Sequence, residues 1–153
     1  MSLSQKRETV LSALFSLMSN VSFSLQGGAG GFKTTSRRLK HWSDVSVSDR
    51  PALFMTCHGE TPTYRAENLP AYQKLSVHVY VYLSTADATI VGDTDISLIL
   101  DAFDTALSPG PGEQRQTLGG LVSHCRVDGD ILRDPGDMDG EGIIIIPISV
   151  SLT

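Results

Sequence analysis

Long apolar runs and cysteines are both scarce in this sequence. No stretch approaches the ~20 consecutive apolar residues that a membrane-spanning helix needs. The first residues lack the basic-then-apolar order of a signal peptide, so we expect a protein made and used in cytoplasm. Cys57 and Cys125 are its two cysteines, too few for a disulfide framework, and both are expected to stay reduced. Neither lies in a recognisable nucleophile motif, which argues against a catalytic cysteine.

Positive charge is also in deficit. The chain has 12 lysines and arginines against 17 aspartates and glutamates, a net charge of −5, so the overall field repels nucleic-acid phosphates and anionic lipids. We therefore expect no sequence-specific nucleic-acid binding and no membrane binding. One local basic cluster either faces solvent or meets an acidic partner surface. It consists of Arg37, Arg38, Lys40 and His41.

The remaining composition is typical of a soluble globular protein. The chain has 153 residues, of which 41% are hydrophobic and 19% are charged. This length is enough to bury one apolar core. We therefore treat residues 1–153 as a single domain.

Two segments have the spacing of apolar residues, three and four apart, that predicts an amphipathic helix. The first runs from about Ser4, a candidate N-cap, to Ser19, and the Gly-rich run 26–31 follows as a connector. The second covers 94–107, with acidic residues at its start as caps. The prolines and glycines at 109–112 forbid its continuation.

Alternating patterns or continuous apolar runs predict five strands, at 33–42, 51–56, 76–83, 120–128 and 143–152. Within the first of these, residues 38–42 fit a coil equally well. The last two form a long C-terminal hairpin, joined by the acidic segment 128–142. Pro147 predicts an edge or a bulge in the final strand. This order of elements predicts an α+β fold, in which a largely antiparallel, mixed sheet packs against two helices.

The strand predicted at 76–83 carries large side chains on both faces. Val77, Val79 and Val81 point one way, while Tyr80 and Tyr82 point the other. We expect helices to cover the valine face, and another subunit or an edge of the fold to cover the tyrosine face. Both tyrosines should therefore lose exposure on packing or assembly.

A glycine-rich run offers the first comparison with a known chemical motif. The run 27–31 resembles a phosphate-binding loop, but Phe32 stands where a glycine must precede Lys33. The run also opens no helix, so its amides would not converge on a phosphate. The segment is expected to be a flexible linker.

The other groups of polar residues also lack the spacing that chemistry needs. The acidic segment 128–142 is not an EF-hand loop, because Leu132 occupies a ligand position. Ser123 and His124 face opposite sides of a strand and form no triad with Asp128. The four histidines lie on separate segments without zinc-ligand spacing. We therefore predict no catalytic, cofactor-binding or metal-binding residue, and a protein that is not an enzyme.

Two parts of the sequence combine several short motifs in a fixed order. The first is the run Arg50-Pro51-Ala52-Leu53-Phe54, followed by His58-Gly59-Glu60 and the tyrosine-rich strand. The second is more distinctive and combines 116–122, 125–131 and the closing strand 143–148 with its proline. Both parts resemble the tail terminator, or tail-completion, proteins of long-tailed bacteriophages, and the similarity covers roughly residues 5–152.

This resemblance implies a structural virion protein at the junction of tail and head, present in the host cytoplasm during assembly. Such a subunit forms a hexameric ring with its own copies on the tail tube protein and ends tube polymerisation. It then offers a surface to the head-completion or connector protein, and DNA passes through the ring lumen. No cofactor is implied. The alternatives are a head-tail connector, a tail-tube ring component or, from another class, a small ligand-binding or hydrolytic domain.

Charge and exposed loops suggest where such a subunit would meet its partners. The basic segment 37–41 and the acidic segment 134–141 are expected to pair between subunits. The polar or Gly-rich segments 26–31, 59–69 and 128–142 are expected to dock on neighbours. The candidate interface residues are Arg37, Arg38, Lys40, Trp42, Tyr80, Tyr82, Asp134, Asp137, Asp139 and Glu141.

Overall fold

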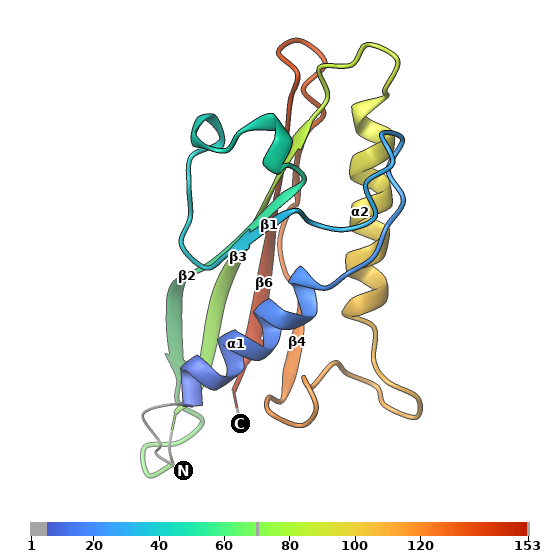
Figure 1. The fold of residues 1–153 in the computed structure, drawn as a ribbon. Coiled ribbons are helices and arrows are strands. Elements are labelled where there is room, and N and C mark those ends of the chain that lie inside the picture. Colours follow the sequence, from blue (N-terminus) through green and yellow to red (C-terminus); the bar gives the residue numbers. More distant parts are fainter. Residues whose placement is uncertain (1–5, 70, 153) are drawn as a thin grey trace.

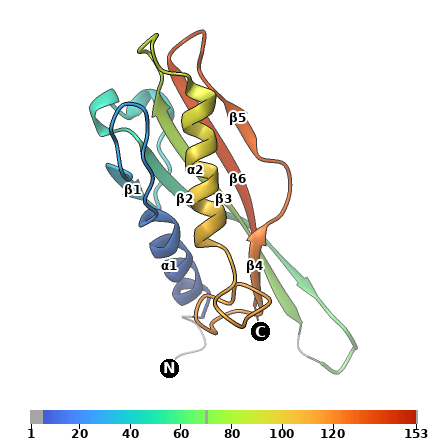
Figure 2. The ribbon, with the colours of Figure 1, turned by 90° about the vertical axis from the view of Figure 1, so that its right-hand side faces the viewer.

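The structure is a computed structural model that describes residues 6–69 and 71–152. Both helices lie on one side of a six-stranded sheet (Figure 1, Figure 2). The protein is therefore an α+β fold, as predicted. Its elements are α1 (Lys6–Ser19), β1 (Thr34–Ser36), the 3-10 turns η2 (Trp42–Asp44) and η3 (Val47–Asp49), β2 (Ala52–Thr63), β3 (Tyr72–Ser84), α2 (Gly92–Ala106), β4 (His124–Val127), β5 (Leu132–Asp134) and β6 (Glu141–Ser151).

Both predicted helices are confirmed. In α1 the buried side chains are Val10, Leu11, Leu14 and Met18. They are four of the six apolar residues whose spacing predicts the helix, and the other two, Phe15 and Leu17, are half-buried. The proposed cap Ser4 lies outside the described residues. Helix α2 begins at Gly92, two residues earlier than predicted, and its N-cap position makes no side-chain hydrogen bond. Within the described part of the chain, neither helix is long and apolar enough to span a bilayer.

One predicted cap residue of α2 has a different role. The carboxylate of Asp95 is buried and accepts hydrogen bonds from the backbone and side-chain nitrogens of Gln26, at 3.0 and 3.1 Å. The glycine-rich connector that follows α1 is thereby tied to the first turn of α2. The negative charge also lies at the positive end of the helix dipole.

The sheet is mixed, with the strand order β1-β2-β3-β6-β4 and with β5 also pairing with β6. Strand β1 runs parallel to β2, and the four other pairs described are antiparallel. Strands β2 and β3 are much longer than predicted, because residues 59–63, expected in a flexible loop, pair with 72–76. The loop between these strands therefore covers only 64–71.

The C-terminal hairpin is confirmed in outline and corrected in detail. Residues 120–123 are turns, and the first strand is only β4. The connection predicted at 128–142 contains the short strand β5, which pairs with β6. Pro147 lies in β6 opposite the break between β4 and β5, where its carbonyl accepts from the Asp128 amide at 3.0 Å. Its missing N–H points to the same interrupted side, so the proline removes no ladder hydrogen bond there. The pairing of β3 with β6 passes Pro147 without a register shift.

The strand predicted at 33–42 is shorter in the structure, where β1 covers only Thr34–Ser36, and residues 38–41 adopt the coil alternative. The Ser36 hydroxyl accepts a hydrogen bond from the Arg38 amide at 3.0 Å, and the chain turns away from the sheet edge instead of extending along it. Residues 37–50 then form a segment with two 3-10 turns, which we call the strap. It covers part of the sheet face opposite the helices.

The sheet therefore packs on both faces, but unequally. The helix side forms the main core, which includes Leu14, Met55, Val79, Ile99, Phe103 and Ile146. On the other side the strap forms a smaller cluster with one end of the sheet. That cluster contains Val45, Ala52, Phe54 and Tyr82, with Trp42, Tyr80 and Ile143 packed against it.

Candidate interaction surfaces

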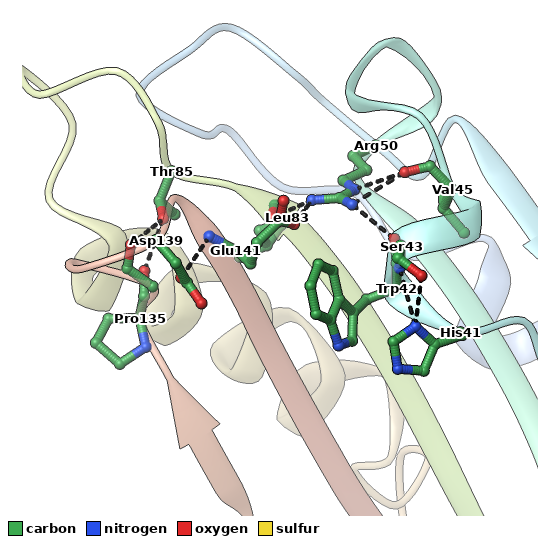
Figure 3. A network of polar contacts seen from close by, with 11 residues as sticks. His41, Trp42, Ser43, Val45, Arg50, Leu83, Thr85, Pro135, Asp139 and Glu141 are labelled. Atoms are coloured by element: carbon green, nitrogen blue, oxygen red, sulfur yellow. Dashed lines mark hydrogen bonds and ion pairs between the residues drawn. The ribbon is translucent and has the colours of Figure 1, made fainter.

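The strap is held to the sheet by one buried arginine. The guanidinium of Arg50, 6% exposed, donates to the carbonyl oxygens of Trp42 at 2.7 Å and Val45 at 2.9 Å. It also donates to the Leu83 carbonyl oxygen at 3.3 Å and forms an ion pair with Glu141 (Figure 3). A planar group with five N–H donors suits this set of acceptors. Arg50 thus connects the strap, β3 and the start of β6.

The strap also buries one residue that was predicted to lie at a subunit interface. Tyr82 is only 5% exposed in the single chain, and its hydroxyl donates to the Lys40 carbonyl at 2.6 Å. Burial raises the pKa of Tyr82, and neighbouring Tyr80 raises it further. Tyr82 thus loses its exposure through packing within the chain, which is one of the two outcomes predicted for it. Trp42 is half-buried against the same cluster.

The two oppositely charged segments proposed to meet between subunits already have partners inside the chain. Arg37 forms an ion pair with Glu8 of α1, and Glu141 forms one with Arg50. Asp134 and Asp139 accept hydrogen bonds from backbone amides of their own hairpin. The remaining exposed charges of the candidate set are Arg38, Lys40 and Asp137.

Beyond the strap, the same face of the sheet carries apolar side chains that no helix covers, since both helices lie on the opposite face (Figure 2). Strand register places Tyr80 beside Ile145 and Ile145 beside Leu132, and places His78 beside Pro147 in the next row. We call these five residues the open strip. Leu132 is 51% exposed, and the other four are half-buried.

A pair of histidines lies at one end of the open strip. The His58 and His78 rings stack with their centroids 3.8 Å apart, and the Tyr80 hydroxyl lies 3.4 Å from Nδ1 of His78. The pKa of His78 lies below its ordinary value, because burial and then the neighbouring His58 disfavour the charged ring. Both histidines line a small polar cavity of about 310 Å³, together with Lys74 and Asp128.

The long hairpin of β2 and β3 extends beyond the body of the sheet (Figure 2). The β6 partner of β3 ends opposite Lys74, so the pairs Pro62–Gln73 and Thr63–Tyr72 lie beyond the end of β6. One further contact follows that end, where the Leu152 amide donates to the Gln73 carbonyl at 2.8 Å. We call residues 61–73 the arm. Its exposed side chains include Tyr64 at 68% and Leu69 at 44%, and the Arg65 guanidinium lies over the Tyr72 ring, 4.0 Å from the centroid.

The base of the arm is tied to the first turn of α1. Arg7 donates two hydrogen bonds to the Glu60 carboxylate, at 2.7 and 2.8 Å. This contact lowers the pKa of Glu60 and raises that of Arg7. Because both side chains are in water, its main effect is on the direction of the arm and not on stability.

An open groove of about 540 Å³ lies between the two helices and the loop that follows α2. Its walls come from the second half of α1, the last turn of α2 and residues 116–119. Most of its lining is apolar, and it includes Ala13, Ser16, Leu17, Val21, Ala106 and Leu118. No sequence pattern predicted this groove, because its walls come from segments that lie far apart in the chain.

The residues that the sequence offered as candidates for catalysis or metal binding have the following surroundings. Asp128 pairs with Lys74 at 3.3 Å, and the pKa of His124 is lowered by burial and then by Arg126 and Arg115. Burial raises the pKa of Cys125 to about 12. Within residues 6–69 and 71–152, no group of three or more His, Cys, Asp or Glu side chains is placed to hold a metal ion.

Comparison with models of protein families gives no match to this sequence, and comparison with curated proteins gives none either.

Proposed function

We propose that this chain is a structural virion subunit that forms a ring with its own copies on the tail tube of a long-tailed bacteriophage. The ring ends tube polymerisation and offers a surface for head attachment. The resemblance in 116–122, 125–131 and 143–148 supports this proposal. The resemblance also implies a hexamer, and the lumen of the ring would let DNA pass.

The open strip is the observation that carries the assembly part of the proposal. A contiguous apolar strip across three strands, edged by polar residues, is typical of a surface that binds another protein. Here it crosses β3, β6 and β5 at Tyr80, Ile145 and Leu132. The strap covers only one end of this face, so the rest is accessible to a second molecule.

The mechanism proposed for termination is a difference between the two faces of the ring. Heterologous contacts between copies close into a ring when the rotation between them closes, and otherwise give a filament. One face of the ring would match the end of the tube. The other would differ from it, so that no further tube subunit adds and the head connector binds instead.

The test is to add the purified chain to growing tubes of the tail tube protein and to measure tube lengths by electron microscopy. We expect short tubes of defined length with the chain at their ends. Leu132→Asp, which charges the open strip at an exposed position, should weaken ring formation and capping, whereas Leu98→Asp on α2 should not. Tubes that grow without limit beside a folded chain would contradict the proposal. Polymerisation of the chain alone would indicate a tube component, and binding only to heads would indicate a connector.

The second candidate function is binding of a small ligand, and the polar cavity beside the histidine pair favours it. His58, His78 and Lys74 supply donors there, while Asp128 is already paired with Lys74. Titration of the chain with inorganic phosphate and with acetate, followed by calorimetry, tests this function. Saturable binding that is lost in His58→Ala would support it, and no heat at millimolar anion would exclude these anions.

A further inference from the structure

We infer that neighbouring copies join head to tail, with the arm of one chain seated in the groove between α1 and α2 of the next. This contact rests on the proposed self-assembly and specifies where that assembly occurs. The arm is residues 61–73, and the groove is the 540 Å³ site beside residues 116–119.

Both surfaces are incomplete in a single chain. Tyr64 and Leu69 expose apolar side chains at the tip of the arm, while the groove presents an apolar lining to solvent. A volume of about 540 Å³ lies within the roughly 300–1,000 Å³ typical of sites that enclose whole ligands. The groove therefore has room for more than one large side chain.

The arm cannot reach the groove of its own chain. In both views the arm leaves the lower end of the molecule on the side away from the loop that follows α2 (Figure 1, Figure 2). Its base is fixed there by the contact between Arg7 and Glu60. Since arm and groove lie at the same end but on opposite sides, the occupant of the groove is a second copy in the same layer. That arrangement is heterologous and repeats around a ring.

Charge at the rim is compatible with this occupant. The arm tip carries Arg65 and Glu67, one charge of each sign, and the loop beside the groove carries Glu113 and Arg115. The groove lining itself contains no charged side chain among the residues that form it. The apolar side chains of the tip, Tyr64 and Leu69, therefore enter an apolar site without charges, while the charges of the tip and of the loop can pair at its edge and set the orientation.

Two variants separate the halves of the contact. Tyr64→Ser combined with Leu69→Ser removes the apolar tip, and Ser16→Arg fills the groove from an exposed position on α1. Each should weaken self-association by about tenfold to a hundredfold, because the apolar area of one or two side chains is lost from the interface. Val47→Ser with Leu98→Ser is the matched control for the tip variant, since both residues are exposed and lie outside both surfaces. Ser12→Arg is the control for Ser16→Arg, because it adds the same side chain one turn earlier on α1, at an exposed position that does not line the groove. The controls should associate like the unchanged chain.

Mixing the two variants gives the decisive measurement. The tip variant keeps its groove and the groove variant keeps its tip, so a one-to-one mixture has a single productive contact per pair. Sedimentation velocity should therefore show monomers for each variant alone, dimers for the mixture, and larger oligomers for the unchanged chain.

If both variants still assemble and cap tubes, the arm contact is overturned while the proposed function stands. If each is monomeric and the mixture forms no dimer, a head-to-tail contact is overturned. An unchanged chain that is monomeric in solution and at tube ends overturns both proposals.

Discussion

Arg50 shows how a single residue decides the shape of one sheet face. Its guanidinium donates to three carbonyl oxygens and pairs with Glu141, which is 91 residues away in sequence. Arg50 is thus the side-chain donor that these carbonyl oxygens share. The strap stays on the sheet because leaving it would abandon an ion pair whose arginine is almost entirely buried.

Arg50→Met is therefore expected to destabilise the fold by about 3–5 kcal/mol, because breaking a buried pair leaves Glu141 and the strap carbonyls without their donor. Urea denaturation followed by circular dichroism measures this free energy of unfolding. Arg38→Met, on an exposed side chain of the same strap, should stay within about 0.5 kcal/mol of the unchanged chain. Equal effects of the two substitutions would contradict the anchoring role of Arg50.

His78 predicts a pH dependence of stability. Its pKa in the folded chain is lower than the ordinary value of 6.5, so below that value the unfolded chain binds more protons than the folded chain. Its contribution to stability is then complete above about pH 6.5 and is lost as the pH falls through the folded pKa. Urea midpoints at about pH 7.5 and about pH 5.5 should differ less in His78→Gln than in the unchanged chain. His58→Gln removes only the charge of the neighbouring ring, the smaller cause of the lowered pKa of His78, and should reduce the pH dependence of stability less. If His78→Gln leaves the pH dependence unchanged, His78 is not its source.

Among the elements, the sequence predicted those helices and strands whose buried side chains recur at a regular spacing. The helix α1 and the middle of β3 were identified because their apolar side chains recur at the period of the element. The outer half of β2, Gly59 to Thr63, has no such pattern and contains Pro62, which sits opposite Gln73. An arm in water is held by its backbone ladder, so its sequence lacks the alternation from which strands are recognised.

The interface residues were harder to predict than the elements, for a related reason. Alternation shows that Tyr80 and Tyr82 share one face of β3, but it does not show what covers that face. The strap covers Tyr82 through contacts made by Arg50 and the Lys40 carbonyl, and such long-range contacts have no local sequence signal. Tyr80 stays half-buried because the strap ends before it. Sequence alone therefore predicted that both tyrosines share one face, but it could not show which of them the chain itself covers.

The junction of β4, β5 and β6 offers a test at this scale. Gly129 has a φ of +124°, and a Cβ atom there would lie 3.2 Å from Cγ of Pro147. Gly129→Ala should therefore cost about 1–3 kcal/mol, because both the backbone conformation and the contact with the proline become strained. Gly59→Ala is the matched control, since nothing lies within 4 Å of its added Cβ, and it should change stability by at most about 0.5 kcal/mol. Thermal unfolding of both variants checks the difference.

In the molecule as a whole, the two faces of the sheet differ in how completely their side chains are buried. The helix side supplies the main core, with side chains such as Leu14, Ile99 and Ile146 fully buried, and therefore supplies most of the stability. The other face is closed at one end by the strap and bare at the open strip. Together with the arm and the groove, the strip gives one chain several incompletely buried apolar surfaces. Substitutions on them are expected to affect association more than folding.

Net charge provides a test of what kind of contact would hold copies of the chain together in the proposed ring. Each chain carries −5, so copies repel one another, and raising NaCl from about 0.1 M to about 1 M shortens the screening length from about 10 Å to about 3 Å. If the contacts are mainly apolar, the oligomer fraction in sedimentation should rise with salt, because repulsion is screened while apolar burial is not weakened. Pairing of the basic segment 37–41 with the acidic segment 134–141 predicts the reverse, a loss of oligomer as salt rises.

In the apolar case Arg38→Glu with Lys40→Glu should lower association only by adding negative charge, and about 1 M NaCl should restore most of it. In the charge-paired case the same variant should stay dissociated at every salt concentration.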